Sequence, residues 1–108
     1  MPDAINPHVA AKGGDTALLQ LFLDRGGKVN LKDVDAFTPL HFASNFGHSD
    51  TCEFLMQHGA NVDARSRFRS VPLHFAAEHG RTDIMLLLRG GAGADALNTD
   101  RATLTTSR

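Results

Sequence analysis

One phrase occurs twice in this chain, 33 residues apart, and this period limits the fold more than any other feature. Residues 38–43 read Thr-Pro-Leu-His-Phe-Ala, and residues 71–76 read Val-Pro-Leu-His-Phe-Ala. The same offset relates Gly47 to Gly80. A fixed period of this length is typical of stacked helical repeats. The sequence therefore predicts a chain that presents a surface to another macromolecule.

Each copy of the phrase has the chemistry of a helix start. Thr38 can cap a helix, because its hydroxyl can accept from the free backbone N–H groups of the first turn. Pro39 suits the first helical position, where its missing N–H costs nothing. Gly47 can end this helix in a left-handed conformation, and Asp50 can cap a second helix that ends at Gly59. Each period thus predicts two short helices followed by a turn.

These features resemble the ankyrin repeat, a β-turn followed by two antiparallel helices with a T-P-L-H-x-A signature. Both full copies carry this motif, and Gly47-His48 and Gly59-Ala60 match other fixed points of the family. A weaker upstream copy, residues 7–11, keeps the histidine but lacks the leucine before it. The resemblance covers about residues 5–98. It implies an all-α solenoid of stacked helix-turn-helix repeats joined by β-hairpin-like turns.

The chain of 108 residues is expected to form a single ankyrin-repeat domain over residues 1–108. The resemblance places the repeats at about residues 5–32, 33–65 and 66–98. Residues 99–108 are expected to be a polar tail or the start of a truncated repeat.

Three positions depart from the family's pattern. Ala36 and Arg69 stand where the family has a glycine in a turn that favours positive φ, at a cost on the order of 1 kcal/mol each. Val71 replaces the threonine, which removes a cap worth about 1 kcal/mol. In the family the threonine hydroxyl also bonds the motif histidine, so His74 is expected to be held less firmly than His41.

The end of the third repeat is irregular. Residues 84–88 are apolar all round, a pattern that predicts a helix buried on every side. Residues 89–95 contain two candidate Gly-Ala turns, either of which would end this helix. The polar chain after Asp95 offers no helix pair to cover it. Three alternatives account for the uncovered apolar side of this helix. The chain is a piece of a longer array, or this C-terminal face self-associates, or Leu86 and the tail shield it locally.

Composition excludes several classes of protein. A formal net charge of −1 favours neither nucleic acid nor a membrane as a partner. The single cysteine excludes an internal disulfide and suits a reducing compartment. No signal peptide is visible at the start, and the longest apolar run, residues 84–88, is too short to span a bilayer. We therefore expect an intracellular protein, in the cytoplasm, with the nucleus as the alternative.

No pattern of residues in the sequence indicates a catalytic or metal-binding site. His41 and His74 belong to the repeat motif, and Cys52 is expected to be a small core residue rather than a nucleophile. No Cys/His spacing resembles a zinc site, and no local Ser/His/Asp set suggests catalysis. We expect no catalytic residue, no cofactor and no metal.

Ankyrin-like stacks usually bind along a concave side built from the turn tips and the exposed ends of the first helices. Carried over to this chain, that surface has eleven predicted partner-binding residues: Val34, Asp35, Phe37, Asn45, Phe46, Arg65, Arg67, Phe68, Ser70, Glu78 and His79. Lys12 and Lys32 fall in comparable places in the first repeat.

Phenylalanines are the expected anchors of this surface, because exposed aromatic side chains are common at interfaces. The anchors would be Phe37, Phe46 and Phe68, and the alternative is that Phe37 and Phe68 tuck against neighbouring turns. Phe42 and Phe75 are expected in the core, because they lie within a helix beside packed alanines.

Three arginines, Arg65, Arg67 and Arg69, alternate around Phe68. On an extended arm, alternate side chains share a face, so the three would form a basic stripe suited to an acidic or phosphorylated partner. The alternative is a solvated turn. Nucleic acid is a weaker expectation, because the stripe is short and the chain slightly acidic.

The sequence thus predicts a non-enzymatic protein–protein interaction module that binds through its concave helix and turn surface. One alternative is a regulatory ankyrin segment of a larger polypeptide, docking on that polypeptide's own catalytic or channel domain. Another is a scaffold that self-associates through its C-terminal repeat. The fold by itself does not identify the partner.

Overall fold

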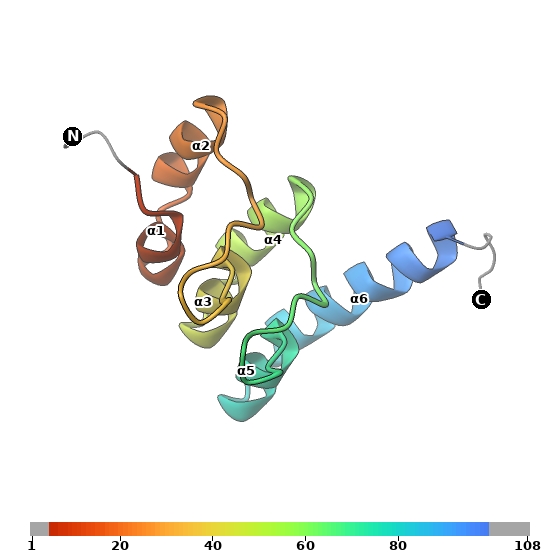
Figure 1. The fold of residues 1–108 in the computed structure, drawn as a ribbon. Helices are drawn as coiled ribbons and strands as arrows, with labels where there is room; N and C mark the ends of the chain where they lie inside the picture. Colours follow the sequence, from red (N-terminus) through yellow and green to blue (C-terminus); the bar gives the residue numbers. More distant parts are fainter. Residues whose placement is uncertain (1–4, 100–108) are drawn as a thin grey trace.

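The computed structural model describes residues 5–99, with side chains described for residues 5–90. Within this range it contains six helices and no strand: α1 (Pro7–Gly13), α2 (Thr16–Asp24), α3 (Pro39–Asn45), α4 (Ser49–Gln57), α5 (Pro72–Glu78) and α6 (Thr82–Thr99). The helices form three pairs that stack one behind the next (Figure 1). The predicted all-helical repeat stack is confirmed.

The first helix of each pair is short and starts with a proline, as the repeated phrase predicts. In α3, Leu40 and Ala43 are fully buried, and the corresponding alanines Ala10 and Ala76 are buried in α1 and α5. These small side chains let neighbouring first helices pack closely against one another. The first helices therefore form a continuous row along one side of the stack (Figure 1).

The core runs through all three pairs. Its largest apolar side chains are Leu19, Leu40, Leu55, Ile84 and Leu88. Cys52 is also fully buried, which confirms its prediction as a core residue. Burial raises the pKa of its thiol to about 11, so the thiol stays protonated at neutral pH.

The two turns between repeats have hairpin-like hydrogen bonds. The N–H of Asp33 donates to the Phe37 carbonyl at 3.0 Å, and the N–H of Ser66 donates to the Ser70 carbonyl at 3.0 Å. The carboxylate of Asp33 and the hydroxyl of Ser66 each accept two backbone N–H groups of their own turn. Each turn is therefore held by the side chain of its first residue.

Backbone strain occurs where the family pattern has glycine. Ala36 has φ of 64° and Arg69 has φ of 62°, in the left-handed region that side chains disfavour. The predicted geometry is therefore kept without glycine, at a cost of about 1 kcal/mol for each residue.

Histidines connect consecutive repeats. His8 Nε2 donates to the Phe37 carbonyl at 2.8 Å, and the equivalent His41 Nε2 donates to the Ser70 carbonyl at 2.8 Å. Each bond runs from the first helix of one repeat to the turn of the next. The motif histidine thus fixes the distance between neighbouring repeats.

The two full copies hold their histidine differently. The Thr38 hydroxyl donates to His41 Nδ1 at 3.0 Å, as the family resemblance implies, and the Thr38 N–H donates to the same atom at 2.9 Å. His74 is exposed, and the Val71 N–H donates to its Nδ1 at 3.2 Å. The expectation that His74 is held less firmly is confirmed.

Helix α6 corrects two predictions. It continues from Thr82 to Thr99, so neither of the two candidate turns in residues 89–95 ends it. A glycine inside a helix costs only about 1 kcal/mol, and the alternating alanines here are the best helix formers. The helix is also not buried on every side: Ile84 and Leu88 are buried, whereas Leu86 is 64% exposed. No helix in the described part of the chain is long and apolar enough to cross a membrane.

Candidate protein-binding surface

The turn tips of the second and third repeats touch each other. The Arg67 N–H donates to the Asp35 carbonyl at 2.9 Å, and the Arg67 guanidinium lies 3.8 Å from the Asp35 carboxylate. Val34, at the first of these tips, is 87% exposed. The ion pair is largely in water and stabilises little. The backbone bond is what joins the tips into one edge.

Behind the tips, Phe37 is the centre of an aromatic cluster. Its ring centroid lies 5.3 Å from that of His41, 5.9 Å from Phe42, 5.7 Å from Phe75 and 6.1 Å from Phe68. Phe37 is half-buried among these rings, so the tucked alternative describes it, whereas Phe68 remains 66% exposed. The cluster therefore places one exposed aromatic ring beside a row of partly covered ones.

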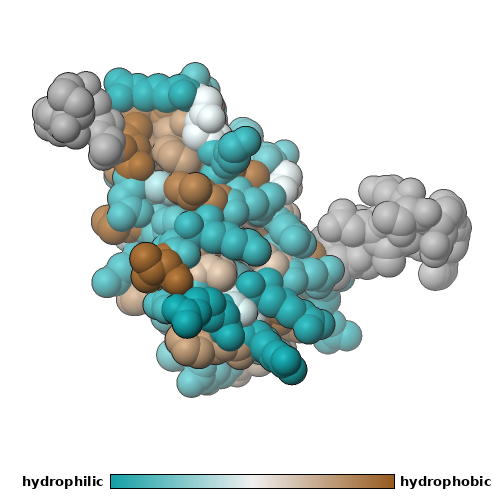
Figure 2. Space-filling view, in the orientation of Figure 1, coloured by the Kyte–Doolittle hydropathy of each residue, from teal (hydrophilic) through white to brown (hydrophobic). Residues whose placement is uncertain are grey.

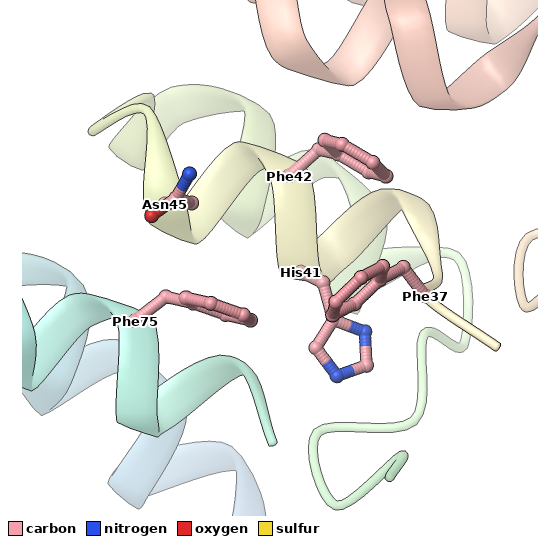
Figure 3. A pocket seen from close by; sticks show the side chains of 5 residues that line it. All are labelled: Phe37, His41, Phe42, Asn45 and Phe75. Carbon is pink, nitrogen blue, oxygen red and sulfur yellow. The ribbon is translucent and has the colours of Figure 1, made fainter. Parts of the chain in front are cut away.

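The sequence predicted that Phe42 and Phe75 are core residues, but both are only half-buried; Phe42 packs against the core cluster from its edge, and Phe75 is not part of the cluster. Phe42 follows Leu40 by two residues, which turns it about 200° around the helix, away from the buried side. The rings of both phenylalanines line a pocket between α3 and α5 (Figure 3). The helical spacing from Leu40 is the signal that would have placed them correctly.

The pocket has a volume of about 110 Å³ and is lined by Phe37, His41, Phe42, Asn45 and Phe75. His41 is buried, and burial lowers its pKa below the ordinary value of 6.5 even though the hydrogen bond to the Ser70 carbonyl opposes this. Asn45 Oδ1 accepts a hydrogen bond from His79 Nε2 at 2.7 Å. Two predicted site residues therefore meet where the C-terminal ends of α3 and α5 lie next to each other. The pocket wall is therefore uncharged, and it is aromatic except for Asn45.

Phe46, the third expected anchor, lies farther along the stack at the end of α3. Its ring is 41% exposed, and the ammonium of Lys12 stands 5.3 Å from the ring centroid. This cation–π contact links the first repeat to the second. Phe46 thus extends the exposed aromatic surface toward the first repeat, separately from the cluster around Phe37.

The three arginines do not lie on one extended arm. Residues 66–69 form a tight turn, in which the Arg69 N–H donates to the Ser66 carbonyl at 2.9 Å. The alternation that predicted a common stripe therefore fails, because the chain reverses between Arg65 and Arg69. Arg65, Arg67 and Arg69 are all exposed around this turn.

The remaining predicted residues lie around this surface. Glu78 and His79 are exposed at the end of α5, Ser70 is half-buried in the turn, and Lys32 is exposed before the preceding turn. In Figure 2 apolar side chains appear as separate groups among polar ones, not as one broad apolar face. Among the described residues, no group of three His, Cys, Asp or Glu side chains is placed to hold a metal ion.

Comparison with known proteins identifies the architecture. The family described as "Ankyrin repeats (3 copies)" matches residues 8–100. The chain is also 46% identical over 43 residues to "Protein phosphatase 1 regulatory subunit 12A" of Mus musculus, and equally to that of Rattus norvegicus. These matches cover 40% of this chain and 4% of each relative, so the chain spans a small part of their length.

Proposed function

Because the chain belongs to the ankyrin-repeat family, we propose that it is a non-enzymatic protein–protein interaction module that binds a partner through its turn tips and first helices. One observation carries the proposal: the 66% exposed ring of Phe68 stands beside Phe37 and the small aromatic pocket. Interface hot spots are enriched in large aromatic residues that become buried in well-packed pockets when the partner binds.

The charge of this surface supports an acidic or phosphorylated segment as the partner. Arg65, Arg67 and Arg69 lie within three residues of Phe68 in the sequence and are exposed, and only Arg67 has an anionic neighbour, Asp35, within the described ion pairs. Guanidinium groups form strong paired hydrogen bonds with carboxylates and phosphates. The turn can therefore supply charge preference even without a straight stripe.

A peptide-display selection against the whole chain tests the proposal. The enriched peptide is synthesised, and its affinity is measured by calorimetry for the wild type and for Phe68→Ala, Phe46→Ala and Leu86→Ala. We expect Phe68→Ala to weaken binding by about tenfold or more and Phe46→Ala by less. Leu86 is equally exposed but lies on α6, so Leu86→Ala is the matched control.

The same variants decide whether the assignment fails. Helical circular dichroism and the melting temperature should stay close to the wild-type values for Phe68→Ala and Phe46→Ala. A collapse of the fold in both would mean that these rings are core residues. Unchanged affinity in both would mean that the partner binds elsewhere.

A second candidate is a regulatory segment of a larger polypeptide, docking on that polypeptide's own catalytic or channel domain. The 46% identity over 43 residues to a regulatory subunit of protein phosphatase 1 favours a regulatory role, in the form in which the repeats act on a separate catalytic subunit. Purified protein phosphatase 1 is therefore the first protein to test, by calorimetry and by its activity with and without the chain. Binding lost in Phe68→Ala would support regulation through this surface, and no binding would remove this partner.

A third candidate is self-association through the C-terminal repeat. Leu86 is 64% exposed on α6, and Leu73 is only half-buried on α5. Light scattering over a wide concentration range measures the outcome. A mass that rises with concentration and falls back in Leu86→Glu would support self-association, and a constant monomer mass would exclude it.

A further inference from the structure

We propose that the pocket between α3 and α5 receives one apolar side chain, leucine or methionine, from a partner segment that carries acidic residues on both sides of it. The inference rests on the proposed function and specifies the partner's chemistry at that surface. It also assigns a role to Phe42 and Phe75, which the sequence had placed in the core.

The size of the pocket selects a single side chain. Its volume is about 110 Å³. Pockets for whole drug-sized ligands are several times larger, about 300–1,000 Å³, and a dry cavity of about 150 Å³ holds one benzene molecule. A group slightly smaller than a benzene ring therefore fills the space. Leucine and methionine side chains meet this limit, and larger aromatic side chains exceed it.

The wall of the pocket selects an uncharged group. Phe37, Phe42 and Phe75 present rings to it, and the His41 ring completes the wall (Figure 3). His41 is neutral in this arrangement, because Nε2 donates to the Ser70 carbonyl while Nδ1 accepts the Thr38 N–H.

The five lining residues include no carboxylate, so a lysine or arginine would lose hydration without gaining an anionic partner. An aliphatic side chain has no charge and therefore loses no such hydration on entering the pocket. A thioether sulfur gains favourable contacts with aromatic rings. These considerations favour leucine and methionine over a cationic side chain.

Asn45 can fix the backbone of the inserted segment. Its Oδ1 accepts from His79 Nε2 at 2.7 Å, which sets the orientation of the amide. The N–H groups of that amide then remain to donate to a carbonyl of the partner, next to the inserted side chain. A neighbouring hydrogen bond of this kind gives direction to an otherwise apolar contact.

The charges around the pocket select acidic flanks. The whole chain has a net charge of −1, but the third-repeat turn that carries Phe68, beside Phe37 of the pocket, has three exposed arginines, Arg65, Arg67 and Arg69. Arg67 is paired with Asp35, and the Asp33 carboxylate accepts two backbone N–H groups of its own turn, so within the described ion pairs Arg65 and Arg69 have no anionic partner. Complementary charge accelerates association and rejects partners of the wrong sign. Acidic residues beside the inserted side chain therefore match this surface, and basic residues do not.

The test titrates the whole chain with short capped peptides and follows it by nuclear magnetic resonance. The probe is acetyl-Glu-Asp-Leu-Asp-Glu-amide. Its matched controls carry alanine or methionine at the centre, or lysines in place of the acidic residues. We expect the leucine and methionine peptides to bind about tenfold more tightly than the alanine peptide, and the lysine peptide to bind more weakly than all of these. Shifts should map to the Asn45 amide and the His41 ring.

Two variants act on the pocket in opposite ways. Phe75→Ala removes a wall, and Asn45→Phe fills the space from the rim. The equivalents of Asn45 in the other repeats are the long, exposed Lys12 and Glu78, so the fold should tolerate a large side chain there. Both variants should abolish the preference for leucine over alanine. Leu86→Ala, on α6, should keep the preference.

Several results would overturn the inference: equal affinity for the leucine and alanine peptides, shifts away from the pocket, or no shift at millimolar peptide. The displayed-peptide ligand separates this failure from that of the proposed function. If Phe68→Ala weakens that ligand while Asn45→Phe does not, the surface binds a partner but the pocket takes no side chain. If neither variant matters, the proposed function fails as well.

Discussion

The second and third repeats share one motif but differ in what covers them. Leu40 is fully buried, whereas its equivalent Leu73 is half-buried, and buried His41 corresponds to exposed His74. The third repeat covers the second, and within the described residues no further pair covers the third (Figure 1). The motif is therefore buried by the next repeat rather than by its own helix pair.

Hydrogen bonding follows the same rule. His41 Nε2 donates to the Ser70 carbonyl, which belongs to the third repeat. The residue that stands in the same relation to His74 is Thr103, which lies outside the described residues. The Pro-Leu-His-Phe-Ala segment that the two copies share thus contributes differently to stability in its two positions. Because the chain offers matched residues 33 positions apart, each difference can be measured directly.

The largest expected difference is between Leu40→Ala and Leu73→Ala. Leu40→Ala leaves a cavity in the middle of the core and should lower the free energy of unfolding by about 3 kcal/mol or more. Leu73→Ala should lower it by about 1–2 kcal/mol, because the side chain is already partly in water. Urea denaturation followed by circular dichroism measures both. Equal losses would mean that the two repeats are covered to the same extent.

The next difference is between His41→Ala and His74→Ala. His41→Ala leaves the Ser70 carbonyl and the Thr38 N–H without their partner, at a cost of about 2–3 kcal/mol. His74→Ala removes one longer bond at an exposed site and should cost less than about 1 kcal/mol. The melting temperatures of the two variants measure the difference. A larger loss for His74→Ala would show that this histidine has a buried partner.

A smaller effect is expected from pH, since protonation leaves the side chain in place. Burial lowers the pKa of His41 below 6.5, so the unfolded chain binds the proton more readily than the folded chain. The contribution of His41 is therefore complete above pH 6.5 and is lost as the pH falls below 6.5 toward the folded pKa.

The matched control for this pH effect is His41→Gln, which does not titrate but can still donate to the Ser70 carbonyl. Urea midpoints of the wild type and the variant, measured at several pH values, should converge as the pH falls below 6.5. A constant difference over that range would mean that His41 titrates alike in the folded and unfolded chains.

The stack itself follows from local sequence, and this is why it could be predicted. The helix starts, the glycine stops and the histidine of the motif all act over a few residues, and the period repeats them. The positive φ at Ala36 and Arg69 was predictable for the same reason, because the turn geometry persists when glycine is absent.

The predictions that were wrong concern residues whose position depends on neighbouring elements or on competing helix and turn propensities. Arg65, Arg67 and Arg69 alternate in sequence, but a turn held by the Ser66 hydroxyl separates them. Helix α6 continues through glycines that elsewhere in the chain end helices, because alanine-rich sequence outweighs the glycine signal there. Phe42 and Phe75 were misplaced because the buried alanines next to them in the sequence lie at a different angle around the helix.

A gain in stability is expected from Ala36→Gly and from Arg69→Gly. Both residues have positive φ, and glycine relieves the strain while making the unfolded chain more flexible, so the net gain is about 0.5–1 kcal/mol. Ala36 lies in the turn between the first and second repeats, and Arg69 lies in the equivalent turn between the second and third, so the two gains should be similar. Thermal melts measure them. A loss in either variant would mean that the left-handed turn is not retained in solution.

The smallest expected effect tests the comparison most directly, by making the two copies of the motif identical. Val71→Thr provides a hydroxyl that can donate to His74 Nδ1, as Thr38 donates to His41 at 3.0 Å. His74 is exposed, so water competes for that bond and the gain should be only a few tenths of a kcal/mol.

The reciprocal change, Thr38→Val, removes the same bond at a buried site and should cost about 1 kcal/mol. Urea midpoints of the two variants measure this asymmetry. If the gain in stability from Val71→Thr equalled the loss from Thr38→Val, the hydroxyl would stabilise the fold by the same amount in both places. Coverage by the next repeat would then not be what distinguishes them, because a bond that water can replace stabilises less than one that it cannot reach.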